Sequence, residues 1–472
     1  MRKLKKLAAL SLAAVMTLSM AACGKDDDKK DDDKTTGASD ATTEGTTEGG
    51  NTGEPNLDGG GRTIKIGTWW DMYYGSNDAD IYADPSVSDE ELAQKHFDAL
   101  KRVEEKYNVK IEYVNLTYDG IQESINNSIL AGKPDCDIYL VNSSIGVPAV
   151  ANGYVQNLEE VLPADCDLFT NQNYLKPVNL PFEGTYLMGV VGGEDVPAGA
   201  YCLAFNKQML EDAGLENPND LYAKGEWTWD KWREYLLALT KDSDGDGVTD
   251  VYGYGARYDF LINGLTMSNG TQIASTATEN LSSKEVGEVL DFIYKMYNVD
   301  HVAKPWNVDD FNANHLAYQD GSVACWITAA WIADGDDDVG FEQIWAPFPI
   351  GPSGNQETNP RKNAGDLNYY MIPVGVENPY LVYSAFSDYQ NWYEDDFELR
   401  DWVNEWWHDN SFTEENYDVM YYVGEAVTLD FWNTSSELNE AIPQLLDGTM
   451  TAAQFQESYK NTVQSFLDDL FK

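Results

Sequence analysis

RTIKIGT (residues 62–68), VKIEYV (109–114) and DIYLV (137–141) are three apolar or alternating segments that decide the fold class of this chain. Each has the length and the apolar pattern of a β-strand. Between them, residues 90–106 and 121–131 carry apolar side chains at helical spacing. This order of strand, helix, strand, helix and strand predicts an α/β layer fold with parallel strands and right-handed crossovers.

Length and charge narrow the classes of protein further. The body from residue 62 onward, about 410 residues, is too long for one hydrophobic core and predicts two domains. A hydrophobic content of 43% and an aromatic content of 12% are those of a folded protein. The net charge of −49 argues against nucleic acid or an anionic membrane as a partner, because phosphate binding needs a basic patch. The same charge disfavours an anionic ligand.

Residues 1–22 are predicted to be a lipoprotein signal peptide. A basic start precedes the apolar run Leu7–Met20, which is too short to span a bilayer. The run ends in Ala21-Ala22-Cys23, which resembles a bacterial lipobox, so we expect cleavage before Cys23 and attachment of a diacylglyceride there. Two acyl chains suffice for stable anchoring. The alternative is an ordinary signal peptide cleaved near Ala22; the lipid anchor predicts the extracellular face of the bacterial cytoplasmic membrane.

Residues 23–61 are predicted to be a disordered, lipid-anchored linker. They consist of Asp and Lys runs followed by Thr, Gly, Glu and Ser, with almost no apolar side chains. Such a segment buries too little apolar surface to offset the entropy cost of ordering it. We therefore expect a flexible stalk that holds the folded body away from the membrane.

Four cysteines remain beyond the anchor, and none forms a C-x-x-C pair. An extracellular location permits disulfides, and an even count allows two, but no spacing identifies the pairs. Buried free thiols are an equal alternative, because small apolar side chains suit strand-like runs. The four are Cys136, Cys166, Cys202 and Cys325.

An acidic loop, DSDGDGVTD (residues 242–250), has the spacing of a site for a hard cation. Carboxylates occupy loop positions 1, 3, 5 and 9, and glycines occupy positions 4 and 6, where the backbone must turn. Position 12 is Gly253, so the bidentate Glu of a full EF-hand is missing. The spacing predicts a structural Ca²⁺, with a solvated acidic turn as the alternative. The predicted ligands are Asp242, Asp244, Asp246, the carbonyl of Val248, and Asp250.

A series of motifs resembles family 1 extracellular solute-binding proteins, the substrate-capturing lipoproteins of ABC importers. Ala204-Phe-Asn206-Lys207 followed by Leu210-Glu-Asp-Ala-Gly214-Leu resembles one segment of that family, and Thr228-Trp-Asp-Lys-Trp resembles the helix start that follows it. The resemblance covers about residues 62–472, and it rests on the order of the motifs more than on any one of them. The others are Ile64–Trp70, Gly132–Val141, Gly321–Trp331 and Leu446–Thr451.

The resemblance implies a two-lobed periplasmic-binding-protein-like (type II) fold with a hinge and an interlobe cleft. Lobe 1 would comprise residues 62–199 plus about 349–395, and lobe 2 residues 200–348 plus about 396–472. The chain would first cross between the lobes near Gly199–Tyr201 and would return near Ala346–Gly351.

The ends of two predicted strands supply candidate ligand-binding residues, because ligands of open α/β sheets bind off the carboxyl ends of the strands. The first strand runs into Trp69, Trp70 and Asp71, and the third runs into Asn142 and Ser143. Aromatic faces stack on sugars, while carboxylates and amides bind the hydroxyls. The alternatives are aromatic side chains that fill the core and polar side chains that form an ordinary turn.

In the second lobe, the family resemblance implies ligand contacts at Tyr258, Asp259, Trp331 and Trp432, each of which could instead be a core aromatic or an interface residue. The implied function is capture of a carbohydrate, such as an oligosaccharide, by a monomeric protein that delivers it to a membrane permease. The competing classes are a receptor for a peptide or polyamine, a secreted glycoside hydrolase and a structural adhesin. No catalytic motif is present, which disfavours the hydrolase.

Overall fold

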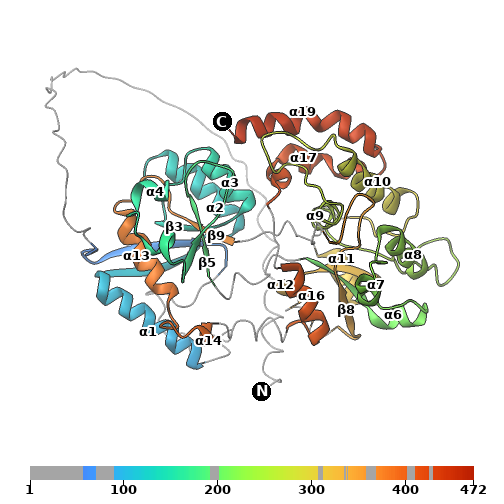
Figure 1. Ribbon diagram of the computed structural model, residues 1–472, viewed down its shortest axis with the longest axis horizontal. Helices are drawn as coiled ribbons and strands as arrows, with labels where there is room; N and C mark the ends of the chain where they lie inside the picture. Colours follow the sequence, from blue (N-terminus) through green and yellow to red (C-terminus); the bar gives the residue numbers. More distant parts are fainter. Residues whose placement is uncertain are drawn as a thin grey trace, which may run out of the picture.

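The computed structural model describes residues 57–70, 90–191, 201–306, 312–333, 336, 339–357, 368–400, 410–424 and 429–471. These residues form two lobes that lie side by side, each built on its own β-sheet (Figure 1). The two-lobed α/β architecture predicted from the sequence is therefore confirmed. The predicted signal peptide, the anchor Cys23 and the linker up to residue 56 lie outside the described residues.

Lobe 1 contains a six-stranded sheet in the order β2-β1-β3-β9-β5-β4. The strands are β1 (Arg62–Thr68), β2 (Val109–Asn115), β3 (Ile138–Asn142), β4 (Leu175–Pro177), β5 (Leu187–Val190) and β9 (Asn368–Met371). Strand β1 pairs in parallel with β2 and β3, as the sequence predicts. The pairs β3–β9, β5–β9 and β4–β5 are antiparallel. The carboxyl ends of β1, β2 and β3 therefore meet at one edge of the sheet.

Both faces of this sheet are covered, because successive side chains of a strand point to opposite sides. In β3, Ile138 and Leu140 pack with α1 and α13, whereas Tyr139 and Val141 pack with α2, η3 and α3. The helices and single turns of lobe 1 are α1 (Glu90–Tyr107), α2 (Tyr118–Ser124), η3 (Ile125–Ile129), α3 (Ser143–Ala151), α4 (Leu158–Val161), α5 (Asp167–Thr170), α13 (Pro379–Gln390) and α14 (Phe397–Arg400).

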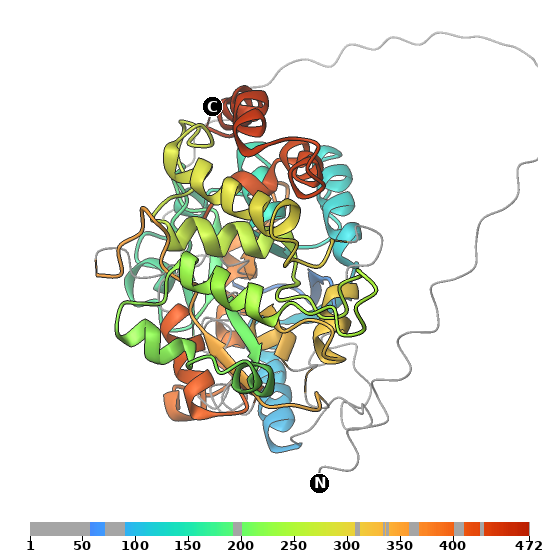
Figure 2. The same cartoon turned by 90° about the vertical axis from the view of Figure 1, so that its right-hand side faces the viewer.

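Lobe 2 contains a three-stranded antiparallel sheet in the order β7-β6-β8. Its strands are β6 (Cys202–Asn206), β7 (Cys325–Thr328) and β8 (Gln343–Ala346). Its helices are α6 (Lys207–Asp212), α7 (Pro218–Ala223), α8 (Trp229–Leu239), α9 (Tyr258–Ser268), α10 (Lys284–Asn298), α11 (Ala313–Gln319), α12 (Ala330–Ala333), α16 (Glu414–Gly424), η5 (Phe431–Thr434), α17 (Ser436–Ala441), α18 (Pro443–Leu446) and α19 (Ala452–Leu470). Figure 2 shows the C-terminal helices beside helices of lobe 1, as the contact between α19 and α3 requires.

The division of the chain between the lobes differs from the prediction in two respects. After β8, the chain stays on lobe 2, because the N–H of Ile350 donates to the carbonyl of Trp227 and Gln356 Nε2 donates to the carbonyl of Tyr222. The described residues up to 357 therefore still belong to lobe 2, and the return to lobe 1 is not near Ala346–Gly351. Helix α14 also belongs to lobe 1, where the Phe397 ring contacts the Tyr393 ring at a centroid distance of 5.8 Å, so the chain does not pass to lobe 2 at about residue 396 as predicted.

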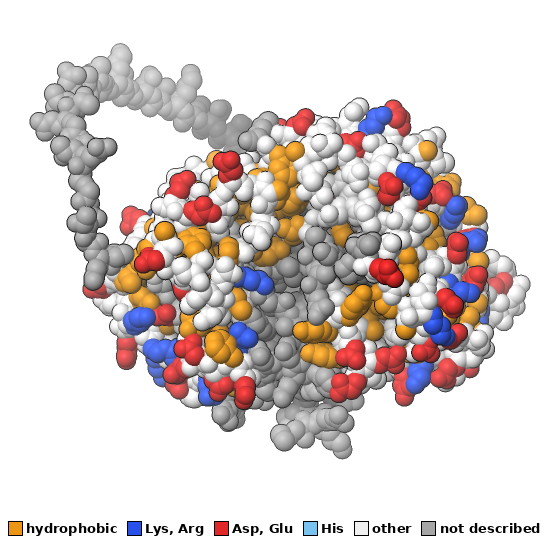
Figure 3. Space-filling view, in the orientation of Figure 1, with side chains coloured by type: hydrophobic (Ala, Val, Ile, Leu, Met, Phe, Trp, Pro, Cys, Tyr) orange, Lys and Arg blue, Asp and Glu red, His pale blue; other side chains and the backbone are white. Residues whose placement is uncertain are grey.

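The surface agrees with the composition. Acidic side chains are spread over both lobes, and hydrophobic side chains border the region between them on the face drawn in Figure 3. Within the part of the chain that the structure describes, no helix has the length and apolar character needed to cross a bilayer.

Candidate ligand-binding site

An aromatic corner forms where β1 ends. Trp69 and Trp70 follow β1 directly, and their rings meet edge to face at a centroid distance of 5.2 Å. Both side chains are half-buried. The Trp69 ring also meets the ring of Tyr118 edge to face, with centroids 5.6 Å apart. Sequence analysis did not single out Tyr118, although it lies three residues beyond the end of β2 at the same sheet edge.

Polar groups at the end of β3 join this corner. Asn142 is buried, and its Oδ1 accepts hydrogen bonds from the N–H of Ile145 at 3.2 Å and from the Ser144 hydroxyl at 2.8 Å. Its Nδ2 donates to the Tyr118 hydroxyl at 3.0 Å. Asn142 is therefore the N-cap of α3 and also a support for Tyr118. The neighbouring Ser143 is buried, and its Oγ has no hydrogen-bond partner among the described residues.

This corner lies beside the seam between the lobes. Helix α3 begins at the corner and contacts both η5 and α19 of lobe 2. Val147 of α3 belongs to the hydrophobic core of lobe 2. Leu429, which precedes η5, packs against that core and against the lobe 1 cluster around Val141 and Ile145. Of the residues predicted from the ends of β1 and β3, those that the structure describes, Trp69, Trp70, Asn142 and Ser143, therefore lie at one corner next to the other lobe.

On lobe 2, Tyr258 and Asp259 are the first two residues of α9. The half-buried Tyr258 ring meets the Trp306 ring edge to face at 5.9 Å, and burial raises the pKa of Tyr258. The Asp259 carboxylate accepts hydrogen bonds from Arg257 Nε at 2.9 Å and from Arg257 Nη2 at 2.5 Å. The Arg257 guanidinium also lies over the Phe260 ring. Asp259 is thus already paired, and Trp306 is an aromatic neighbour that the sequence did not indicate.

The other predicted residues of lobe 2 have different surroundings. Trp432 is fully buried in η5, and its Nε1 donates to Asn263 Oδ1 at 2.8 Å. This burial favours a supporting role beneath the surface of the lobe. Trp331 belongs to α12, but its side chain lies outside the described residues, and so does the whole of Asp71.

A buried carboxylate holds the segment that leads into η5. Asp430 accepts hydrogen bonds from the N–H groups of Ile273 at 2.7 Å and Ala274 at 2.8 Å. Burial raises its pKa from 3.8 to about 6, because desolvation of the charged carboxylate outweighs the backbone hydrogen bonds that it accepts. Asp430 therefore ties the part of lobe 2 that contacts α3 to the loop before α10.

The acidic loop lies on the surface of lobe 2, closed by a pair of bridging hydrogen bonds between Lys241 and Val251. Among the described residues, one group of carboxylates has oxygens that converge within 4.8 Å, and it comprises Asp242, Asp244 and Asp250. Asp246 is outside this group, and its Oδ1 accepts a hydrogen bond from the N–H of Val248. Three of the four predicted carboxylate ligands thus have an arrangement that suits a hard cation.

Comparison with known families identifies the chain. The sequence model of the bacterial extracellular solute-binding proteins matches residues 82–395, which is more than half of the chain. The chain belongs to this family. Members of this solute-binding family are substrate-binding components of ABC transporters and are not enzymes. A search of curated protein sequences gave no match.

Solved structures share the fold of this solute-binding protein. The maltose/maltodextrin-binding domain MalE of Bdellovibrio bacteriovorus, bound to maltotriose, has 16% identity and a TM-score of 0.58, and the match covers 86% of this chain and 100% of that one. The substrate-binding protein Lmo0181 of Listeria monocytogenes, in complex with cycloalternan, has 14% identity and a TM-score of 0.60, with 87% and 100% covered. UgpB of Mycobacterium tuberculosis, in complex with glycerophosphocholine, has 14% identity and a TM-score of 0.57, with 79% and 95% covered. These matches confirm the periplasmic-binding-protein-like fold.

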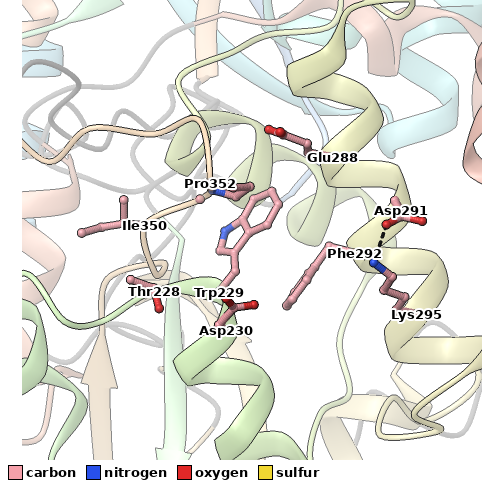
Figure 4. Close-up of a pocket in the computed structure, with 10 residues that line it drawn as sticks. Thr228, Trp229, Asp230, Glu288, Asp291, Phe292, Lys295, Ile350 and Pro352 are labelled. Carbon is pink, nitrogen blue, oxygen red and sulfur yellow. Dashed lines mark ion pairs between the residues drawn. The ribbon is translucent and has the colours of Figure 1, made fainter.

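A separate cavity of about 390 Å³ lies within lobe 2, between the start of α8 and α10 (Figure 4). Most of its charged groups are already paired, Asp291 with Lys295 at 2.6 Å and Glu288 with Lys284 at 2.7 Å, while Asp230 also lines the cavity. The indole of Trp229 is buried, and its N–H donates to Ser268. This cavity of the solute-binding protein therefore offers a ligand few free polar groups.

The four cysteines of the folded body are buried free thiols. Burial raises the pKa of Cys136 to about 12 and that of Cys166 to about 11. Thiols with raised pKa values are poor nucleophiles and poor metal ligands. Of the two alternatives left open by the sequence, the structure has the free thiols, and they serve as small apolar side chains of the core.

Proposed function

We propose that this solute-binding protein captures a carbohydrate, an oligosaccharide in the simplest case, and delivers it to a membrane permease of an ABC importer. The observation that carries the proposal is the aromatic corner of Trp69, Trp70 and Tyr118 beside the seam between the lobes. Aromatic rings with adjacent hydroxyl and amide groups are the side chains that bind sugars. The structural relatives that carry maltotriose and cycloalternan support the choice of ligand class.

Capture would proceed by closure of the lobes. A sugar bound to the corner of lobe 1 would recruit groups on lobe 2, among which Tyr258 and Trp306 are candidates. The closed form is favoured only by the difference in ligand affinity between the two forms. A micromolar dissociation constant corresponds to about −8 kcal/mol, which a few stacking contacts and hydrogen bonds can supply after the cost of ordering.

Calorimetry on the purified protein with a panel of oligosaccharides tests this function directly. We expect one glycan series to bind with a dissociation constant in the micromolar range, and we expect no hydrolysis of the bound sugar, because the protein acts as a monomeric receptor and not as an enzyme. A hit among peptides or polyamines, with silence across the glycans, would favour the alternative ligand class that the acidic surface permits.

We also propose two features that accompany the receptor role. Cys23 carries a lipid anchor on the outer face of the cytoplasmic membrane, so a Cys23→Ser variant should appear in the culture medium and should lose incorporation of a labelled fatty acid.

The acidic loop binds one structural Ca²⁺ through Asp242, Asp244 and Asp250, with Asp246 and the Val248 carbonyl as further candidates. The convergence of three carboxylates supports this ion.

A further inference from the structure

We propose that Tyr118 is the sugar-stacking platform of lobe 1, that Asn142 and Ser144 are positioning residues that hold it, and that this corner selects a neutral sugar over a sugar acid. The inference rests on the proposed carbohydrate-binding function and narrows its ligand class. Its basis is a closed ring of three hydrogen bonds among these side chains.

The ring joins the ends of two strands. Asn142 Nδ2 donates to the Tyr118 hydroxyl at 3.0 Å, the Tyr118 and Ser144 hydroxyls are 3.1 Å apart, and the Ser144 hydroxyl donates to Asn142 Oδ1 at 2.8 Å. Tyr118 follows β2, whereas Asn142 and Ser144 lie where β3 passes into α3. The ring therefore holds the Tyr118 side chain, at the start of α2, against the start of α3.

The direction of each bond in the ring follows from the hydrogens available. The N–H of Ile145 donates to Asn142 Oδ1 at 3.2 Å, so this atom is the oxygen and the amide orientation is determined. The single hydrogen of the Ser144 hydroxyl is used on the same Oδ1. The Tyr118 hydroxyl must therefore donate its own hydrogen to Ser144 Oγ, because each hydroxyl has one hydrogen.

This pattern determines what the hydrogen-bonded ring of Tyr118, Asn142 and Ser144 can offer to a ligand. Both hydroxyl hydrogens are used inside the ring, so the Tyr118 and Ser144 oxygens present only acceptor lone pairs. A sugar hydroxyl can donate to these oxygens. A carboxylate beside them would meet lone pairs and would lose hydration without gaining a donated hydrogen. The net charge of −49 acts in the same direction.

The exposure and the backbone before Tyr118 support a ligand-binding role. The Tyr118 side chain is 46% exposed although it is held by two hydrogen bonds and by the edge-to-face contact with Trp69. The preceding residue, Thr117, has φ 63° and ψ 164°, a region that is almost restricted to glycine. Strain of this kind costs about 1–3 kcal/mol and persists where the surrounding structure holds it, commonly at ligand-binding sites.

The first experiment tests the ring without any ligand. 3-Fluorotyrosine at position 118 should give one narrow ¹⁹F resonance in the otherwise wild-type protein. In the Ser144→Ala variant, which keeps the N-cap bond from the Ile145 N–H to Asn142 Oδ1, we expect this resonance to shift or broaden. An unchanged resonance would show that the ring does not hold Tyr118 and would overturn the positioning role.

The second experiment measures sugar affinity by calorimetry, with maltotriose, cycloalternan and trigalacturonic acid as the first probes within a wider panel of neutral and acidic oligosaccharides. We expect Tyr118→Ala to weaken the best neutral ligand about tenfold or more, the equivalent of about 1.4 kcal/mol. Tyr118→Phe and Ser144→Ala should each weaken it several-fold, and the double variant should be no weaker than the worse single one, because both changes break the same ring.

Tyr421→Ala is the matched control, because the Tyr421 side chain is also 46% exposed and lies on α16 of lobe 2. If the wild type binds a neutral sugar and Tyr118→Ala binds it equally well, Tyr118 is not the sugar-stacking residue, while the proposed function stands. Tighter binding of a sugar acid than of every neutral sugar would overturn the selectivity. If the wild type binds no sugar, the proposed function fails and the platform with it, and the ¹⁹F experiment still decides whether the ring exists.

Discussion

The tryptophan that follows β1 on lobe 1 and the tryptophan of η5 on lobe 2 both lie near the seam but differ in burial. On lobe 1, Trp69 and Tyr118 leave part of their surface to solvent. On lobe 2, Trp432 is fully buried and its indole N–H is paired with Asn263. Trp227 of lobe 2 is equally buried, with its N–H paired to a backbone carbonyl. A tryptophan near the seam is therefore a candidate for ligand binding when part of its ring is exposed to solvent. It contributes to stability instead when its ring is fully buried and its indole N–H donates to a protein acceptor.

The largest expected effect tests the stability side of this comparison. Trp432→Ala removes a fully buried indole and leaves Asn263 without its donor, so the free energy of unfolding should fall by about 3–5 kcal/mol. Urea denaturation measures the change. Trp432→Phe, which keeps most of the volume, should cost less. A Trp432→Ala variant within about 1 kcal/mol of wild type would show that the indole is not part of the core.

A second prediction concerns Asp430, which ties the η5 segment to lobe 2. Its pKa in the folded chain is raised from 3.8 to about 6, so the unfolded chain ionises this group first as the pH rises. As the pH rises from about 4 to 6, the Asp430 carboxyl should therefore lower the free energy of unfolding by up to about 3 kcal/mol. Outside that window its contribution should be constant. Urea denaturation from pH 3.5 to 7.5 gives the difference between wild type and Asp430→Asn at each pH.

That difference isolates the one carboxyl from the many others in the chain. Asp430→Asn keeps an acceptor for one of the two backbone N–H groups of Ile273 and Ala274 but cannot ionise. The stability advantage of the wild type over the variant should shrink as the pH rises from 4 to 6. A constant or growing advantage across that range would contradict the raised pKa.

The acidic loop gives a third effect, away from the seam. Calcium at about a hundredfold above its dissociation constant should raise the free energy of unfolding by about 2.7 kcal/mol, and EDTA should abolish the gain. Asp244→Asn should remove the calcium response, whereas Asp246→Asn should keep most of it, because Asp246 is outside the convergent group. Thermal unfolding with and without calcium measures both. Equal loss in the two variants would mean that Asp246 binds the ion as well.

The smallest effect tests the strain on the lobe 1 side. Thr117→Gly relieves the unfavourable backbone conformation but loses the Thr117 hydroxyl that accepts from the N–H of Gly120. We expect stability equal to wild type or higher by up to about 1 kcal/mol. Thr117→Ala keeps the strain and loses the cap, so it should be less stable by about 1 kcal/mol. Equal stability of the two variants would indicate that no strain is stored before Tyr118.

Local sequence patterns predicted the parts of the molecule that depend on interactions between residues close in the chain. The alternation in residues 62–68 and the apolar run in 137–141 specify β1 and β3, and parallel pairing then places Trp69 and Asn142 at one edge. Thr228 caps α8, as its position before the helix suggests, by accepting from the N–H of Lys231. These features depend on nearest neighbours and on side-chain period, which a sequence displays.

Features that depend on packing between segments far apart in the chain could not be predicted from the sequence. Tyr118 becomes a platform only because Asn142 and Ser144, more than twenty residues later, reach its hydroxyl. Trp432 is buried because α9 places Asn263 beside it, although the sequence around it is polar. The segment around Ile350 stays on lobe 2, where a return to lobe 1 was expected, because Ile350 pairs with the residues at the start of α8. Each case needs a tertiary contact that no local pattern encodes.

Calorimetric titration of the protein with neutral oligosaccharides, in wild type and Tyr118→Ala side by side, decides whether the lobe 1 corner binds sugar. We expect micromolar binding of one glycan series by the wild type and a loss of about tenfold or more in the variant. Absence of binding to any glycan, or a variant that binds as tightly as wild type, would contradict the assignment of the lobe 1 corner as the sugar-binding surface.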